Sequence, residues 1–279
     1  MPRSAASLAW RAVNRFFQHN GPDRAAAVAY YTLLSLLPLL IFLISLGAAV
    51  VGSFDEAYRG TLFLLRGIVV HLDESSLATL RAFVERSQRF RWPGILILAW
   101  TSKRSIGALL GALETVFEVK GRSIARGNLV SLALVFLLGL GVLATLLLTT
   151  LLAALEGMVL RFAGAGGASV LSGFSAVVVA RVVPVGIAVV FFYTLYRLVP
   201  GGVIGRRAAW AGALLATALW ELAKAAFAFY IRNLAHYAGL YGALEAVIVL
   251  GLWLELSVSI VLLCAEVIAL LVAAPTPAA

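Results

Sequence analysis

The chain has 279 residues, of which 62% are hydrophobic and only 13% are charged, with a net charge of +9. A soluble domain carries about 25% charged residues, so this composition excludes an ordinary soluble protein and predicts an all-α, polytopic membrane protein. The positive charge lies mostly between the apolar runs, which is typical of membrane topology, so we expect no nucleic-acid partner. The single cysteine, Cys264, excludes an intramolecular disulfide.

Residues 1–24 are predicted to form an amphipathic helix that lies on the membrane surface. Between Leu8 and Gln18 the arginines share one side of the helix. The apolar side is predicted to consist of Trp10, Val13, Phe16 and Phe17. The first long apolar run begins late and is too long for a signal peptide, so we expect no cleavable signal sequence in this segment. Membrane lipids are therefore predicted partners.

Residues 25–272 are predicted to form one membrane domain of six spanning helices. The spans are predicted over residues 25–52, 92–122, 128–155, 175–199, 208–231 and 242–272, with a break in the second. Residues 53–91 are too polar to span and are predicted to be an extracytoplasmic insertion of amphipathic helices, and residues 273–279 form a short tail. The distribution of Lys and Arg between the spans predicts that both termini are cytoplasmic.

The first span is unusually polar in its first half. Tyr30, Tyr31, Thr32 and Ser35 lie there, and Pro38 removes a backbone donor. We expect the Ser35 hydroxyl to bond the carbonyl that Pro38 leaves without a donor. The tyrosines are either interfacial anchors beside a kink or part of a polar patch that faces the interior.

The second span carries a dibasic pair, Lys103 and Arg104, after only about ten apolar residues. We expect the helix to be broken there and the pair to lie in the protein interior. The alternative is an amphipathic helix on the cytoplasmic side. In the fifth span, Gly212 and Ala216 have the spacing of small residues at a close helix contact.

Ionisable residues inside a membrane are costly unless paired, and they mark substrate or ion pathways. The candidates here are Lys103, Arg104, Arg181, Glu221, Lys224, Arg232, Glu245, Glu255 and Glu266. By helical periodicity the charges of the fifth span share one face, and the glutamates of the sixth span share another. We expect the two faces to point toward each other and toward Lys103, Arg104 and Arg181. The alternative is a set of structural ion pairs that fix the helix register.

No catalytic constellation is recognisable. The three histidines have no metal-binding spacing, no phosphate-binding P-loop is present, and the glutamates are too dispersed for a metal-dependent nuclease. We therefore expect neither enzymatic activity nor a bound metal or cofactor.

Several blocks in order resemble the YihY/BrkB family, formerly labelled ribonuclease BN. The motif residues in the first span are Ala26, Ala27, Tyr30, Tyr31, Ser35 and Pro38, and those in the fifth are Trp220, Glu221 and Lys224. The blocks LAWTSKRSIGALLGALETVFEVKGR and YGALEAVIVLGLWLELSVSIVLLCAE also match. The resemblance covers most of residues 23–266 and implies a six-span inner-membrane protein.

Our leading hypothesis is a transporter or flippase-like protein for an amphipathic, anionic, lipid-like substrate in envelope biogenesis. A non-catalytic membrane scaffold that maintains the envelope is the main alternative. A membrane-associated ribonuclease, as the old family label implies, is disfavoured.

Overall fold

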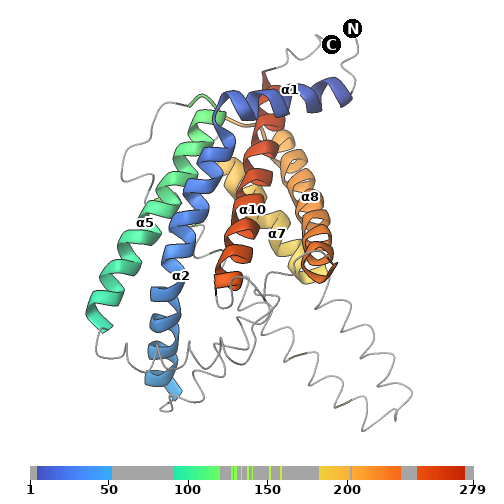
Figure 1. Cartoon of the computed structure of the whole chain (residues 1–279). Coiled ribbons are helices and arrows are strands. Elements are labelled where there is room, and N and C mark those ends of the chain that lie inside the picture. The colour runs from blue at the N-terminus through green and yellow to red at the C-terminus, as the bar shows by residue number, and fades with distance from the viewer. Residues whose placement is uncertain are drawn as a thin grey trace. The chain divides into compact units, whose positions relative to one another are not determined.

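The computed structural model describes residues 5–51, 91–119, 182–201, 203–233 and 244–273, and isolated helical positions between 127 and 158. In these ranges every regular element is an α-helix (Figure 1). The helices of the described ranges are α1 (Ala5–Gln18), α2 (Gly21–Val51), α5 (Arg91–Val116), α7 (Val183–Leu198), α8 (Arg206–Asn233) and α10 (Leu244–Val272). The all-α prediction is confirmed for the described part of the chain.

Two of these helices contain stretches that are long and apolar enough to cross a membrane. They are Arg206–Ile231 in α8 and Val247–Val272 in α10, and α7 is a shorter apolar helix. Both stretches agree closely with the predicted fifth and sixth spans. The predicted third span over residues 128–155 and the insertion over 53–91 lie almost wholly outside the described residues.

The second predicted span is not broken. Helix α5 runs without interruption from Arg91 to Val116, through Lys103 and Arg104. Its proline, Pro93, lies in the first turn, where the missing backbone donor has no helical partner to lose. Polar and charged residues continue a helix as readily as apolar ones, so the expectation of a break was wrong.

The chain divides into two compact units. One comprises Met1–Ala12, Leu113–Leu219 and Cys264–Ala279, and the other Val13–Ala112 and Trp220–Leu263. Helices α1, α5, α8 and α10 each contribute residues to both units.

The first unit packs around small residues on α8. Gly212 and Ala216 are buried, and a side chain added at Gly212 would overlap Ile268 of α10. Tyr196 of α7 also faces this point, 3.5 Å from the position of an added Cβ. The small residues therefore allow close helix approach, as their spacing predicted. Beside them, Tyr196 and Cys264 are fully buried.

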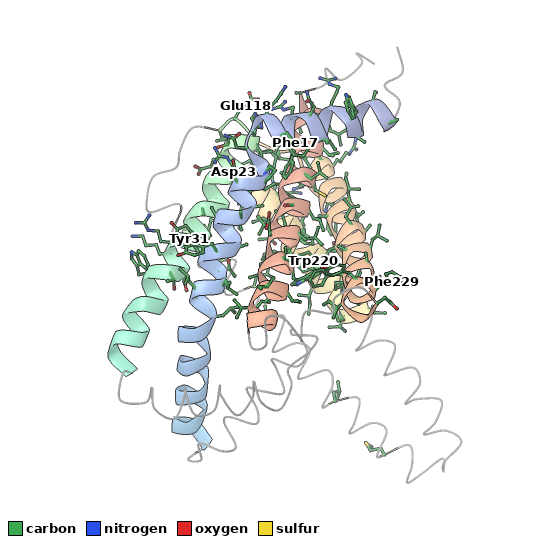
Figure 2. All side chains as sticks on the ribbon, in the orientation of Figure 1. Phe17, Asp23, Tyr31, Glu118, Trp220 and Phe229 are labelled. Carbon is green, nitrogen blue, oxygen red and sulfur yellow. The ribbon has the colours of Figure 1, made fainter. Side chains whose placement is uncertain are left out.

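The second unit contains an aromatic contact between α8 and α10. The ring of Trp253 lies 5.3 Å from that of Trp220 and 5.1 Å from that of Phe227, measured between centroids. Trp220 and Phe227 are seven residues apart and so project from one face of α8. Figure 2 shows Trp220 at this contact. Such aromatic pairs add to the packing energy beyond the area that they bury.

A compact corner joins α1 to α2 in the same unit. Asn20 adopts a left-handed conformation, with φ of 53°, which ends α1. Gly21 then lies against the ring and carbonyl of Phe16, where no Cβ would fit. Arg24 closes the corner by donating from Nε to the carbonyl of His19 at 2.9 Å.

Candidate functional site

The best-defined charged group on a spanning helix is an ion pair on α8. The ammonium of Lys224 lies 2.7 Å from Oε1 of Glu221, one turn earlier. Glu221 lies about 4 Å and Lys224 about 8 Å from the midpoint of the apolar stretch, at 1.5 Å of rise per residue. Half of a bilayer's hydrocarbon core is about 15 Å thick. If α8 spans the membrane, both charges lie at hydrocarbon depth.

The pair is only partly enclosed by protein. The Lys224 and Glu221 side chains are 42% and 38% exposed, although Oε1 of Glu221 is itself shielded. In water an ion pair this open would contribute little to stability. In lipid, a lone charge near a helix centre costs about 2.5–3.5 kcal/mol, so mutual neutralisation becomes important.

Aromatic side chains adjoin the pair along α8. Trp220 precedes Lys224 by four residues and Phe227 follows it by three, so all three project from neighbouring positions on one face. Trp220 and Phe227 contact Trp253 of α10 and fix how this part of α8 is rotated. Trp220, one of the motif residues of the fifth span, is therefore a packing residue that sets the orientation of the charged pair.

Glu255 of α10 points away from α8, which contradicts the expectation that the two charged faces meet. Trp253 faces α8 through its contact with Trp220. Glu255 follows two residues later and so lies about 200° around the helix axis. Its side chain is half-buried, about 7 Å from the midpoint of the Val247–Val272 stretch. Helical periodicity showed which residues share a face but not where the face points.

Glu266 belongs to the other unit and is completely buried, at 0% exposure. Full burial of a carboxyl group requires compensation by its neighbours, and the part of Glu266 in a pathway stays a prediction.

Lys103 and Arg104 are exposed on α5, so the expectation that they lie in the interior was wrong. The guanidinium of Arg104 lies 5.5 Å from the ring centre of Trp100, which is itself exposed. The cation is thus held along the helix surface by the aromatic face. The buried residues of α5 are instead uncharged: Thr101, Leu110, Ala112, Leu113 and Val116.

The side chains of three candidates lie outside the described part of the structure. Arg181 lies outside the described residues. Arg232 and Glu245 lie on α8 and α10, but the described residues do not include their side chains. Their part in a pathway stays a prediction.

The polar motif of the first span makes a contact that sequence reasoning missed. Thr32 and Ser105 share a hydrogen bond of 2.6 Å between α2 and α5. Ser35 is buried and donates to the carbonyl of Thr32 at 2.7 Å. The carbonyl left without a donor by Pro38 is that of residue 34, so the expected rescue by Ser35 was wrong. The signal that could have predicted this contact is the presence of hydroxyl side chains, Thr32 and Ser105, on two apolar helices.

The two tyrosines of this motif differ in environment. Tyr30 is 59% exposed, whereas Tyr31 is half-buried, and their rings meet edge to face at 5.5 Å. Figure 2 shows Tyr31 on α2. Pro38 lies within the continuous helix Gly21–Val51. Among the described residues, no three His, Cys, Asp or Glu side chains gather as a metal site would require.

Curated proteins similar to this chain include several named as membrane proteins and one with a ribonuclease-like name. A UPF0761 membrane protein of Pseudoalteromonas translucida is 31% identical over 265 residues, covering 92% of this chain and 83% of the relative. The ribonuclease-like protein YfkH of Bacillus subtilis is 28% identical over 270 residues, covering 92% of both chains.

A UPF0761 membrane protein of Azotobacter vinelandii is 29% identical over 264 residues, and there this chain spans 62% of the relative. No solved structure matches. The family model described as "Virulence factor BrkB" matches residues 12–277. With the apolar helices α8 and α10, these matches identify the chain as a membrane protein of the BrkB family.

Proposed function

We propose that this protein is a multi-pass transporter or flippase-like protein of the bacterial inner membrane, with an amphipathic, anionic, lipid-like substrate in envelope biogenesis. The proposal includes six spans with both termini cytoplasmic and membrane lipids as partners. It includes no enzymatic activity and no nucleic-acid partner. Its main support is the Glu221–Lys224 ion pair on α8.

The pair supports transport because it is both open and at membrane depth. An ion pair with side chains about 40% exposed has room for a competing anion beside the Lys224 ammonium. A phosphate or carboxylate headgroup that approached Lys224 would displace Glu221, whose charge would then favour release of the headgroup or uptake of a proton. Glu255, at similar distance from the middle of its own helix, is a second position for proton coupling.

Cations on α5 support the same substrate class. Lys103 and Arg104 are exposed and bear the charge that anionic headgroups bind. Arg232 would add to this attraction on α8. The proposal assigns these residues to headgroup capture and the Glu221–Lys224 pair to passage.

A scaffold is the second candidate, and one observation favours it. Glu221 and Lys224 neutralise each other within one helix, so the pair needs no substrate to explain it. A scaffold would keep its function in variants that preserve folding but lose both charges. The ribonuclease-like name of one relative gives a third possibility, which RNA cleavage by highly purified protein would test.

The test is lipid scrambling by the full-length protein in liposomes that contain fluorescent phosphatidylglycerol, read as the fraction bleached by external dithionite. We expect scrambling by the native protein. The scrambling rate should fall at least about tenfold in Glu221→Gln and in Lys224→Met, because each variant leaves one charged side chain without its ion-pair partner. Arg207→Gln, at an exposed position near the start of α8, is the matched control and should retain activity.

Two results would contradict the proposal. Native protein that does not accelerate scrambling, with or without a proton gradient, would exclude lipid transport of this kind. Full activity in a folded double variant, Glu221→Gln with Lys224→Met, would remove the pair from the pathway and favour the scaffold.

A further inference from the structure

Helix α1 presents three different faces. Trp10, Val13 and Phe17 lie within about 60° of one another around the axis, and all three are exposed, Trp10 by 74% and Phe17 by 61%. Ala12 and Phe16 are buried on a second face about 110° away. The sequence had grouped Phe16 with the exposed apolar residues, and the structure separates it from them.

The third face is polar and basic. Arg11 and Arg15 lie within about 40° of each other and about 150° from the exposed apolar face. Asn14 and Gln18 lie between the arginines and the apolar face, and both are exposed. An exposed apolar face opposite a polar, basic face on one helix is the pattern of a helix at a membrane surface.

The corner with α2 fixes the rotation of α1. The ring of Phe16 lies against Gly21, and the Arg24 guanidinium holds the carbonyl of His19. Because Phe16 is locked inward, Phe17 is turned about 100° away from it and outward. Figure 2 shows Phe17 on α1 and Asp23 at the beginning of α2, the helix predicted to enter the membrane first.

We propose that α1 docks on the anionic surface of the bilayer, with Trp10, Val13 and Phe17 inserted at the boundary between headgroups and acyl chains. On the opposite, polar face, Arg11 and Arg15 attract the anionic headgroups. Tryptophan at the outer end of the stripe suits the interface, where an amphipathic ring is favoured. A second copy of α1 is a poor occupant, because it would bring like charges together. This docking does not depend on transport.

The test is site-directed spin labelling of the full-length protein in nanodiscs. Cysteines are placed singly at Val13 and Phe17 on the apolar face and at Asn14 and Gln18 on the polar face. The background is Cys264→Ser, or the native chain if that variant fails to fold, since Cys264 is buried. Collision with oxygen reports contact with lipid, and collision with a water-soluble nickel complex reports contact with water.

In nanodiscs with phosphatidylglycerol we expect oxygen to dominate at positions 13 and 17 and nickel to dominate at 14 and 18. In pure phosphatidylcholine, or in the Arg11→Gln, Arg15→Gln variant, the difference should shrink at least about threefold, because the electrostatic attraction is lost. Equal nickel access at all four positions would overturn the proposal. Shielding of 13 and 17 from both reagents would overturn it in favour of a protein partner.

Discussion

Ile268 of α10 occupies the space that a side chain on Gly212 of α8 would need. Ile is stiff at χ1 in a helix, so it has few ways to move aside. Gly212→Ala should therefore lower stability by about 1–3 kcal/mol, measured as thermal unfolding of the protein in detergent. Gly251→Ala on α10, where the added Cβ meets nothing within 4 Å, is the matched control and should lose no stability.

The same contact predicts a rescue. In the background of Gly212→Ala, a second change of Ile268→Ala should cost less than it does in the native chain, because the overlap is gone. Additive effects in this double-mutant cycle would contradict the proposed fit of Ile268 against Gly212.

The corner between α1 and α2 gives a second prediction. Gly21→Ala should destabilise the corner, because its Cβ would meet the Phe16 carbonyl at 2.7 Å, and a backbone atom cannot swing away. Asn20→Gly should be tolerated, since glycine adopts the observed φ of 53° without strain. Hydrogen exchange of residues 13–24 would report the difference. Equal exchange in the two variants would show that Gly21 is not required for packing.

The hydroxyl contact between α2 and α5 gives a third prediction. Thr32→Val and Ser105→Ala should show a coupling of about 0.6 kcal/mol, the usual size for hydrogen bonds between membrane helices. Thr194→Val is the control, because the Thr194 hydroxyl donates to the carbonyl of Val190 in its own helix at 2.7 Å. A coupling near zero between Thr32 and Ser105 would mean that the 2.6 Å contact does not join the helices.

The sequence was sufficient to predict α8 and α10, because an apolar run of the right length determines a spanning helix almost alone. It could not predict which rings meet, such as Trp253 with Trp220, since that depends on how each helix is rotated in the fold. The same gap explains why the Glu255 face was assigned the wrong direction.

The error on α5 has a different origin. Lys103 and Arg104 were correctly seen to be unfavourable inside lipid, but that cost does not break a helix; it only constrains what surrounds the side chains. Both were therefore expected inside, whereas both are exposed, and Arg104 lies next to Trp100. The free energy of solvating a charge and the free energy of forming a helix are separate quantities. A run of polar residues in an apolar segment does not show which of the two is unfavourable.

The Glu221–Lys224 pair predicts unequal effects of removing its two members. Lys224→Met leaves a carboxylate whose Oε1 is shielded, with no cation 2.7 Å away to neutralise it. Glu221→Gln leaves a lysine, whose longer chain can carry its ammonium toward the interface. A lone charge near a helix centre in lipid costs about 2.5–3.5 kcal/mol, and the lysine escapes part of this cost, so we expect Lys224→Met to cost about 1 kcal/mol more than Glu221→Gln.

The double variant separates neutralisation from packing. Glu221→Gln with Lys224→Met has no charge to compensate, so its stability should return close to that of the native chain. Thermal unfolding in bicelles measures all three variants under one condition. If Lys224→Met is no less stable than Glu221→Gln, the shielded oxygen does not need its cation, and the pair is not held by charge neutralisation.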